Sequence, residues 1–344
     1  MIALVKHTEG AGNLELREVP EPFPASDEVK IKVKAASICG SDLHIKNWDI
    51  GIPMRLPVIP GHEFTGIVTE IGENVKNVSV GDRVTGENTR TSCGVCNQCA
   101  NGSYNLCKHR LATGYAYDGA FAEYVLIPEK RIHKLPDNVD FISGALTDPS
   151  ACAFHAVQEL TGINAGDIVL ITGPGAMGLF SLQYVRSNGG TVVLTGTPKD
   201  ARRLELAREL GADYTITEEE TVREIVMRLS NGEGADVVLE CSGAEPAADL
   251  GLELVRRQGK FTQIGIYGKP VVFDLDRILY KEIKMTGSFS QKYTGWKKAL
   301  ELCSTGKIAV RPLVTHQLPL SDWQKGFSLF ENGEAVKVVF DMEI

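Results

Sequence analysis

The sequence predicts an α/β protein that combines a doubly wound parallel sheet with a second, β-rich domain. Three observations support this prediction. From about residue 166 to residue 268, apolar strand-like segments alternate with helix-like segments, as in βαβ units. The preceding residues instead carry short β-like segments punctuated by glycine and proline. A length of 344 residues is long for one hydrophobic core and favours two domains.

The first part of the chain is predicted to be the β-rich domain. Its β-like segments cover residues 28–37, 64–72 and 121–127, and turn sequences such as PGHE and VGDRV separate them. We expect few long helices in this part.

The second part of the chain is predicted to form the parallel sheet. Strands are expected at 167–173, 191–196, 235–243 and 259–268. Helices are expected at 176–188, at 201–211 with a glycine at its end, and over a stretch that reaches about residue 257. Beyond about residue 293, a helix-like segment (GWKKALELCSTG) and a strand-like segment (AVKVVFDMEI) follow, and we expect this tail to return to the first domain.

The composition is that of a soluble globular protein, with 43% hydrophobic and 23% charged residues. Basic residues number 36 against 44 acidic ones, and the net charge of -8 gives no support to binding of nucleic acid or of anionic membranes. No secretory signal is visible, and no apolar run approaches the roughly 20 residues of a membrane span. Eight cysteines in such a chain favour a cytoplasmic metalloprotein over a disulfide framework.

A glycine-rich turn follows the first predicted parallel strand. It reads Gly173, Pro174, Gly175, Ala176, Met177 and Gly178, which matches G-x-G-x-x-G. The motif alone is weak, but here a strand precedes it and a helix follows it. Such glycines permit a tight turn and let the backbone approach a pyrophosphate at the helix N-terminus. The sequence therefore predicts a dinucleotide site, against the alternative of a structural turn.

The usual partner of this motif is an acidic residue about 20 positions further on, which binds the ribose 2′-hydroxyl. The corresponding positions here are Thr195, Gly196 and Thr197. Three cations follow, namely Lys199, Arg202 and Arg203. A missing carboxylate and nearby cations suit a 2′-phosphate, so NADP(H) is favoured over NAD(H). Two alternatives remain open: the cations form a solvated helix face, or Asp200 takes the carboxylate's role through a different loop length.

Four cysteines lie within one short stretch of the first part. Cys93, Cys96, Cys99 and Cys107 have the spacing C-x2-C-x2-C-x7-C. Four thiolates surround Zn²⁺ tetrahedrally and close it to water and substrate, so the predicted role is structural. An iron–sulfur cluster is the alternative, but the fourth cysteine is seven residues on and no proline follows it.

A second set of metal-ligand residue types is scattered. Cys39 lies in ICGSDLH, and His62 and Glu63 lie in PGHE before a predicted strand. A thiolate, an imidazole and a carboxylate bind Zn²⁺ with one position left open, as catalytic zinc requires. Each residue also has an ordinary interpretation, as a core cysteine, a turn histidine and a surface carboxylate. Spacing alone does not decide between these interpretations.

Taken together, these motifs resemble the zinc-containing medium-chain dehydrogenase/reductases, the alcohol dehydrogenase superfamily. The sorbitol (polyol) and threonine dehydrogenase-like branch is the most similar. The segments CGSDLH, GHEFTGIV, VGDRV, the four-cysteine lobe, GPGAMG and LGAD occur in the family's order, over essentially the whole chain.

The resemblance implies a zinc-dependent alcohol or polyol dehydrogenase with a Rossmann dinucleotide-binding domain. It implies a GroES-like catalytic domain over 1–148 that includes the structural zinc lobe (about 88–110), the Rossmann domain over 149–292, and a return to the catalytic domain over 293–344. It also implies that Cys39, His62 and Glu63 ligate catalytic zinc and that Asp148, in DPSACAFHA, contacts the metal directly or through water. Relatives usually form dimers or tetramers, so a homodimer or homotetramer is expected.

The chain departs from the polyol dehydrogenase pattern at two places. Relatives often carry a Tyr just after the CGSDxH stretch and an Arg after the Phe of a late GxF motif. Here these places hold Ile45 and Ser290. Sorbitol itself is therefore in doubt, whereas another sugar alcohol, a sugar-derived hydroxyl or a 2,3-diol stays open. L-Threonine is less favoured.

The expected reaction transfers a hydride between a nicotinamide and a secondary alcohol or ketone on zinc. Ser41, two residues after Cys39, is placed to relay the proton, with His44 as a possible second member or a structural histidine. His155 is expected to pack against the core. Cys152, Cys241 and Cys303 have no partners at ligand spacing and are expected to be buried small hydrophobes.

Four aromatic residues were open to two interpretations, as walls of the substrate cleft or as core. They are Tyr115, Tyr117, Phe121 and Trp48. Two other classes of function compete with the dehydrogenase interpretation. The first is a zinc-ribbon interaction module, which is disfavoured because no cluster of lysines and arginines lies around residues 92–107. A dinucleotide-binding protein without catalysis is disfavoured because the proposed ligands and Ser41 are all present.

Overall fold

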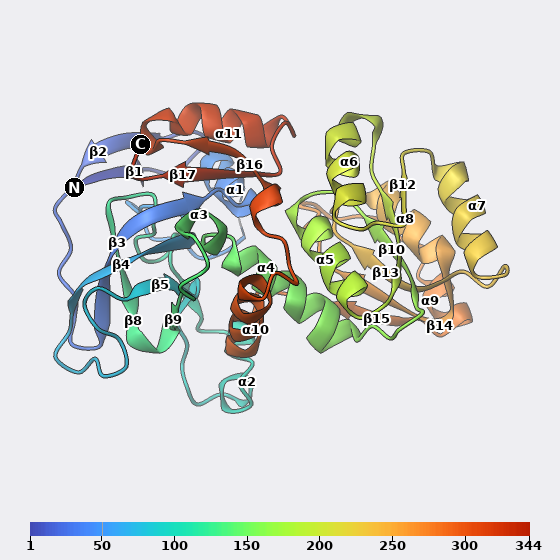
Figure 1. The fold of residues 1–344 in the computed structure, drawn as a ribbon, viewed down its shortest axis with the longest axis horizontal. Coiled ribbons are helices and arrows are strands. Elements are labelled where there is room, and N and C mark those ends of the chain that lie inside the picture. Colours follow the sequence, from blue (N-terminus) through green and yellow to red (C-terminus); the bar gives the residue numbers. More distant parts are fainter. Residues whose placement is uncertain (50) are drawn as a thin grey trace. The chain divides into compact units, whose positions relative to one another are not determined.

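The computed structural model describes residues 1–49 and 51–344, and the chain divides into two compact units. Unit 1 comprises Met1–Asp148, Lys292–Thr305 and Val310–Ile344. Unit 2 comprises Pro149–Gln291 and Gly306–Ala309. Unit 1 thus takes in both the first and the last parts of the chain, and unit 2 is built from the part between them (Figure 1). No helix in the described part of the chain combines the length and the apolar character that crossing a bilayer requires.

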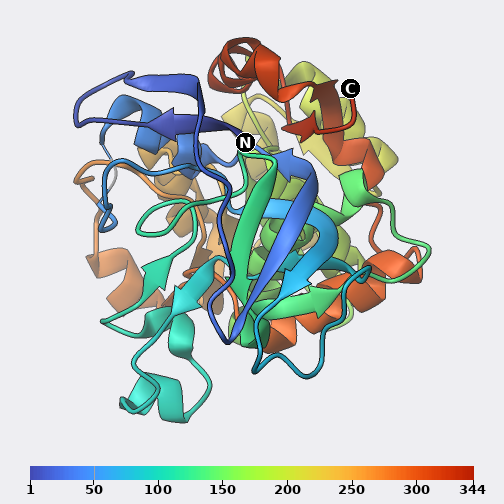
Figure 2. The ribbon, with the colours of Figure 1, turned by 90° about the vertical axis from the view of Figure 1, so that its left-hand side faces the viewer.

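The main sheet of unit 1 has seven strands in the order β16-β17-β3-β4-β5-β9, with β8 also paired to β3. Their bounds are β3 Glu28–Ser37, β4 Glu63–Ile71, β5 Arg83–Gly86, β8 Tyr124–Pro128, β9 Ile132–Lys134, β16 Val314–Leu318 and β17 Lys337–Asp341. All pairs are antiparallel except β16 with β17. Figure 2 shows β3 between β4 and β8. The three strands predicted for this part are confirmed, with shifts of one to three residues at their ends.

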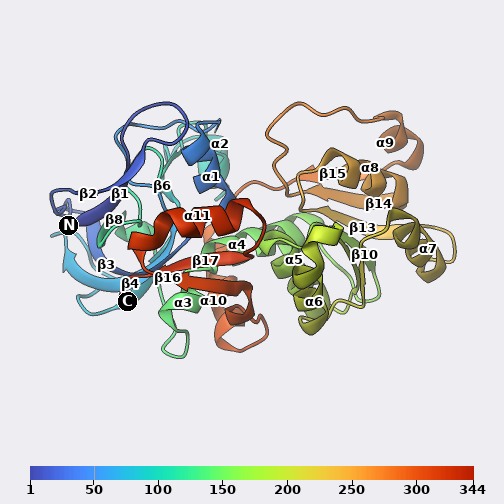
Figure 3. The same cartoon turned by 90° about the horizontal axis from the view of Figure 1, so that it is seen from above.

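Smaller elements complete unit 1. Two two-stranded sheets are formed by β1 (Ile2–Lys6) with β2 (Leu14–Glu18) and by β6 (Thr89–Thr91) with β7 (Leu111–Ala112). The helices are α1 Gly40–Asn47, α2 Asn97–Ala100, α3 Phe141–Gly144, α10 Tyr293–Ser304 and α11 Trp323–Glu331, with short 3-10 turns at Tyr104–Leu106, Glu129–Arg131, Arg311–Leu313 and Leu320–Asp322. One apolar core joins the inner faces of β1, β3, β4 and β17 to α11, which lies along β16 and β17 (Figure 3).

Unit 2 contains the predicted doubly wound parallel sheet. Its six strands run in the order β12-β11-β10-β13-β14-β15 and all pairs are parallel. The bounds are β10 Ile168–Thr172, β11 Thr191–Thr195, β12 Tyr214–Ile216, β13 Ala235–Glu240, β14 Val255–Gln263 and β15 Lys284–Gly287. The two central strands are almost entirely buried because helices cover both faces, which explains their continuous apolar runs.

The helices of unit 2 form two layers. They are α5 Ala176–Ser187, α6 Ala201–Glu209, α7 Glu219–Leu229, α8 Glu245–Leu254 and α9 Asp276–Lys281, with a 3-10 turn at Pro198–Asp200. Helix α5 packs on β10 and β11, whereas α8 packs on β13 and β14, and Figure 3 shows them on opposite faces of the sheet. The chain therefore reverses its direction of travel across the sheet between β10 and β13. This is the switch point at which doubly wound sheets bind ligands.

Several elements differ from the sequence predictions. No bounds were predicted for α4 (Thr147–Phe154), which continues as a π-helix over His155–Thr161. Strand β14 begins at Val255 and ends at Gln263, whereas the prediction was 259–268. An irregular register between β13 and β14 accounts for the early start, which the polar sequence VRRQ concealed. Cys152, Cys241 and Cys303 were predicted to be buried, but all three are half-buried, and none forms a disulfide in the described part of the chain.

Candidate active site and cofactor loop

The scattered residues Cys39, His62 and Glu63 come together in unit 1. One ligand atom from each lies within 4.8 Å of the others. Cys39 is the N-cap of α1, and His62 and Glu63 lie at the start of β4. Strands β3 and β4 pair so that Ser37 is opposite Glu63, and this register brings Cys39, two residues after the end of β3, beside His62. The sheet register, which spacing alone does not reveal, thus assembles the group.

The buried polar atoms of this group suit a cation. His62 and Glu63 are 2% and 1% exposed. Oxygen Oε1 of Glu63 is buried and makes no hydrogen bond within the described structure. An orphaned carboxylate oxygen beside a thiol and an imidazole is costly unless an ion joins them. The three side chains therefore fit a zinc ion that keeps one position open.

Lys337 is a member of the site that sequence reasoning missed. Its Nζ donates to Glu63 Oε2 at 2.6 Å and to the Ile38 carbonyl at 2.6 Å. Burial lowers the pKa of this ammonium, but Glu63 and the neighbouring acids outweigh that effect and the pKa is raised. A lysine inside the apolar run AVKVVF was the available signal, because a buried strand carries a charge only when a partner is present.

Asp42 was also missed, and it ties three segments together. It is the third residue of α1, where its Oδ2 accepts from the Cys39 N–H at 2.9 Å and so caps the helix. Its Oδ1 accepts from the Gly61 N–H at 3.3 Å and lies 3.8 Å from His62 Nδ1. Asp42 is fully buried and orients the two segments that carry Cys39 and His62.

Asp148 lies close to this group but outside the set within 4.8 Å. It is buried in α4, and burial raises its pKa to about 7, with a further contribution from the Glu63 charge. The interaction between these charges shows that Asp148 faces the group.

Ser41, His44 and Tyr115, which were also singled out in the sequence, lie on or beside α1. Ser41 hydrogen-bonds the side chain of Tyr115, whose ring lies 5.5 Å from that of His62. His44, one turn further along α1, pairs through Nδ1 with Asp49 Oδ1 at 2.9 Å. Tyr115 therefore lines the group.

Three aromatic residues lie away from the candidate ligands. Phe121 is in the core between Phe327 and Phe340. Trp48 follows α1 and lines a separate cavity of about 450 Å³ with Met54 and Leu56. Tyr117 lines another cavity.

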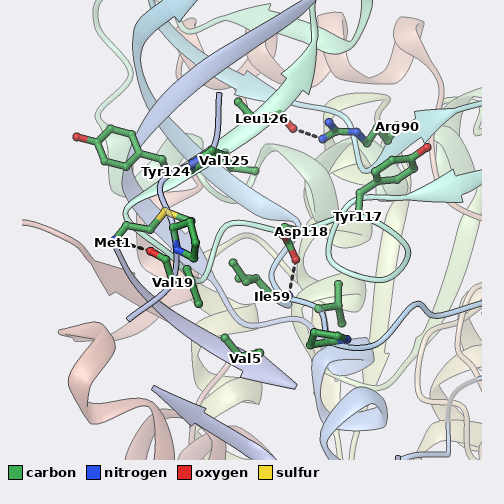
Figure 4. A pocket seen from close by; sticks show the side chains of 14 residues that line it. Met1, Val5, Val19, Ile59, Arg90, Tyr117, Asp118, Tyr124, Val125 and Leu126 are labelled. Carbon is green, nitrogen blue, oxygen red and sulfur yellow. Dashed lines mark hydrogen bonds between the residues drawn. The ribbon is translucent and has the colours of Figure 1, made fainter. Parts of the chain in front are cut away.

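The cavity beside Tyr117 has a volume of about 410 Å³ and is drawn in Figure 4. Apolar side chains such as Val5 and Val125 line it, and Arg90 packs on the Tyr117 ring at 4.6 Å. The Arg90 guanidinium is satisfied by the Leu126 carbonyl and Glu28, and Asp118 by the Ile59 N–H. None of the candidate zinc ligands lines it.

The four cysteines of the lobe form a second group. Their sulfur atoms all lie within 4.8 Å of one another, and Cys93 Sγ is 4.0 Å from Cys99 Sγ. Tetrahedral Zn²⁺ with bonds of about 2.3 Å places its sulfurs about 3.8 Å apart, so the cage has the size for a single ion. The backbone N–H groups of Val95 and Cys96 lower the pKa of Cys93 to about 6, which favours the thiolate that zinc binds.

The glycine turn of unit 2 has the form that a pyrophosphate requires. Gly173 adopts a φ of +88°, and a Cβ on Gly178 would lie 2.0 Å from the Gly173 carbonyl oxygen. Both positions therefore exclude a side chain for internal reasons. Gly175, the N-cap of α5, has an ordinary φ of -76° and open space where its Cβ would be. The open space lies at a helix N-terminus, where an anion is favoured.

The residues after β11 form a capped turn. Asp200 Oδ2 accepts from the N–H and the hydroxyl of Thr197 at 3.0 and 2.8 Å, and its Oδ1 pairs with Arg203 at 3.3 Å. Lys199 and Arg202 are exposed.

His155 is 4% exposed and pairs with Glu159, as its predicted packing against the core requires.

Comparisons with known proteins agree with this geometry. Residues 25–137 match the alcohol dehydrogenase GroES-like domain, and residues 176–305 match the zinc-binding dehydrogenase family. The sorbitol dehydrogenase of Halalkalibacterium halodurans is 46% identical over 341 residues, covering 98% of each chain. The D-arabitol-phosphate dehydrogenase of Enterococcus avium is 38% identical, covering 99% of this chain and 97% of that one.

Solved structures show the same relationship. A structure described as a zinc-binding dehydrogenase from Sinorhizobium meliloti 1021 bound to NADP has a TM-score of 0.88 and 34% identity, and the match covers 99% of this chain and 98% of that one. The GroES-like and Rossmann-type architecture predicted from the sequence is confirmed by these matches. The chain belongs to the zinc-dependent medium-chain dehydrogenases, a family of NAD(P)-dependent alcohol dehydrogenases.

Proposed function

We propose that this protein interconverts a secondary alcohol and its ketone, and that its substrates are polyols, sugar-derived alcohols or diols. The observation that carries the proposal is the buried group of Cys39, His62 and Glu63, with its orphaned carboxylate oxygen. The polyol part of the proposal draws on the two relatives named for sorbitol and for D-arabitol phosphate. The substrate within this class is left to experiment.

Two zinc ions per chain are part of the proposal. Cys39, His62 and Glu63 would hold the catalytic ion, with Asp148 interacting indirectly, and Cys93, Cys96, Cys99 and Cys107 would hold the structural one. When bound, the catalytic zinc supplies polarisation of the substrate oxygen and the nicotinamide supplies hydride transfer. Lys337 and Asp42 hold the ligands in place through Glu63 and the Cys39 N–H.

The proposed proton path uses two residues on one face of α1. Ser41 Oγ accepts the substrate's hydroxyl proton while its own hydroxyl proton passes on toward His44, which lies three positions further along the helix, where helix neighbours meet. Asp49 fixes Nδ1 of His44, and the histidine side chain is 35% exposed, so its other ring nitrogen is available to exchange the proton with solvent. Tyr115 provides an apolar and buried surface beside Ser41.

The preference among polyols follows from the departures from the family pattern. Ile45 is fully buried in a small apolar cluster with Ala112 and Tyr115, so no hydroxyl is presented from that position. Ser290 bonds to its neighbour Gln291 and carries no charge. Both observations favour a substrate with fewer hydroxyl contacts than sorbitol makes, such as a vicinal diol.

NADP(H) is proposed as the preferred cofactor. The carboxylate of Asp200 is already used by Thr197 and Arg203, so it is not free to bind a ribose hydroxyl. Lys199 and Arg202 are exposed beside the end of β11 and suit a 2′-phosphate. The binding residues proposed in the turn are Gly173, Gly175, Ala176, Met177, Gly178 and Thr197.

A homo-oligomer is proposed because unit 2 ends in an exposed edge strand. Strand β15 pairs only with β14, and Met285 on it is 41% exposed. Leu279 and Tyr280, in the helix before it, are 70% and 69% exposed. An exposed apolar edge is a template for pairing with a second copy. A cytoplasmic location is proposed because none of the eight cysteines forms a disulfide in the described structure, as expected in a reducing compartment.

Paired fluorescence titrations with NADPH and NADH, with the metal content of the same sample, test the proposal. We expect roughly two zinc per chain, tighter binding of NADPH, and turnover of diols and sugar alcohols ahead of L-threonine. Cys39→Ala should abolish turnover and leave NADPH binding intact. Cys303→Ala is the matched control, because it removes a half-buried thiol outside the group and should retain activity. Tighter NADH binding would reject the cofactor preference, and binding of neither would reject the proposed function.

A further inference from the structure

Glu240 is the last residue of β13 and is fully buried. Its register partner is Thr172, the last residue of β10. These two strands flank the point at which the chain reverses its direction across the sheet. A carboxylate therefore lies inside the sheet edge at the switch point, one residue from the start of the glycine turn.

One oxygen of this carboxylate accepts hydrogen bonds from the end of β10 and from the segment after β13. Glu240 Oε1 accepts from the Thr172 hydroxyl at 3.2 Å, from the Ser242 N–H at 2.8 Å and from the Gly243 N–H at 2.9 Å. The Ser242 hydroxyl also donates to it. The segment after β13 is thus tied to the end of β10 through a single atom.

The main chain of Glu240 holds a third strand end. Its carbonyl accepts from the N–H groups of Ile264 and Gly265, at 2.8 and 2.9 Å, directly after β14. Gly265 lies so close that a Cβ there would be 2.3 Å from the Gly243 nitrogen. The loops that follow β13 and β14 are therefore packed on each other around Glu240.

Ser242 in turn supports the glycine turn. A Cβ on Gly173 would lie 2.8 Å from Cα of Ser242, so the two backbones are in contact. Gly173 is the residue whose left-handed φ of +88° starts the turn toward α5. Any displacement of Ser242 would move this contact surface, and Glu240 is the residue that fixes Ser242.

The second carboxylate oxygen of Glu240 indicates that this residue has a role beyond stabilising the fold. Glu240 Oε2 is buried and completes no hydrogen bond in the described structure. The nearby Tyr267 hydroxyl has a pKa raised by burial and by the Glu240 carboxylate. An amide of the same size would avoid burying a charge, so a carboxylate here is costly to stability.

We propose that Glu240 is a positioning residue for the dinucleotide, holding Ser242 and Gly243 so that the turn from Gly173 fits the pyrophosphate. This inference rests on the proposed function, since it concerns the same cofactor. Charge-assisted bonds to N–H groups are about twice as strong as neutral ones, which gives a reason for a carboxylate rather than an amide. Glu240 itself need not touch the cofactor.

Glu240→Gln in the zinc-loaded full chain tests the inference. Affinities for ADP-ribose, which carries the pyrophosphate, and for adenosine, which lacks it, are measured by displacement of bound NADPH. We expect Glu240→Gln to lower the affinity for ADP-ribose by roughly tenfold and the affinity for adenosine by less than about twofold. The unfolding temperature of the cofactor-free protein should not fall. Glu253→Gln is the control, because that glutamate is paired with Arg223 on the surface of the same unit and should leave both affinities unchanged.

Three results would overturn the inference. They are unchanged ADP-ribose affinity in folded Glu240→Gln, equal losses for adenosine and ADP-ribose, and a lowered unfolding temperature with intact binding. If Glu240→Gln does not fold, Ser242→Ala replaces it, with an expected loss of about threefold for ADP-ribose because one donor is removed. Unchanged binding by Ser242→Ala would then overturn the inference. A parent protein that binds neither NADH nor NADPH rejects the proposed function instead.

Discussion

At the scale of single residues, the centre of unit 1 depends on a buried ion pair. Lys337 and Glu63 are 1% exposed each and are joined at 2.6 Å. A buried pair is not in itself a source of stability, but removal of one partner leaves the other charge without compensation. The remaining Glu63 would then have both oxygens without a donor, since Oε1 already lacks one.

We predict that Lys337→Met lowers the free energy of unfolding of the zinc-free protein by about 3 kcal/mol or more. The matched control is Lys134→Met. Lys134 pairs with Asp82 at 2.8 Å but is 58% exposed, so its loss should cost less than about 1 kcal/mol. Urea unfolding followed by tryptophan fluorescence measures both. A Lys337→Met protein as stable as the parent would contradict the importance of the pair.

At the scale of elements, the strand–turn–helix unit around the glycine turn separates two roles of glycine. Gly178 excludes a side chain because the Gly173 carbonyl is in the way, whereas Gly175 has free space and an ordinary φ. The fold therefore requires a glycine at position 178. It requires one at position 175 only if a ligand occupies the open space there.

We predict opposite effects for the two alanine variants. Gly178→Ala should destabilise the protein by about 1–3 kcal/mol, since a Cβ would overlap the backbone of the turn. Gly175→Ala should leave the unfolding temperature unchanged. It should lower the affinity for both NADPH and NADH by roughly tenfold or more, because the added methyl group occupies the space proposed for the pyrophosphate. Thermal unfolding and nucleotide titration of each variant provide the measurements. A Gly175→Ala protein with normal affinity would show that this space does not hold the pyrophosphate.

The elements also show which parts of the fold a sequence reveals. Strands β10 and β11 were predicted within two residues because helices on both faces make every position apolar. Strand β12 has three residues, and β15 is an exposed edge, so neither has a recognisable pattern and both were missed. The four-cysteine lobe is local in sequence and was predicted from spacing. Cys39, His62 and Glu63 meet only through the β3–β4 register, so the family resemblance, not their spacing, singled them out.

At the scale of the whole molecule, the exposed edge of unit 2 carries apolar side chains. Strand β15 alternates poorly and places Met285 toward solvent, next to the exposed Leu279 and Tyr280. A sheet edge of this kind is protected in natural proteins by a charge, a bulge or a partner. Lys284 is the only charge on β15, and a second copy of the chain is the partner that we propose.

We predict that Met285→Lys lowers the mass of the particle, measured by light scattering after size exclusion, because a buried like-charge pair would form across the joined edges. Val272→Lys is the control. Val272 is 83% exposed but belongs to the loop after β14, so the same added charge there should leave the mass unchanged. A parent protein that is monomeric at micromolar concentration would reject the proposed oligomer.

Strand β17 has a consequence for how the protein is made. Lys337 reaches Glu63 only when β17 pairs with β3, as in the register of Val339 with Ser37. Glu63 leaves the ribosome 274 residues before that lysine does. During that interval the nascent chain holds a carboxylate intended for the interior without its ammonium partner. The proposed metal centre therefore reaches its final electrostatic balance only after β17 has been synthesised and has joined the sheet.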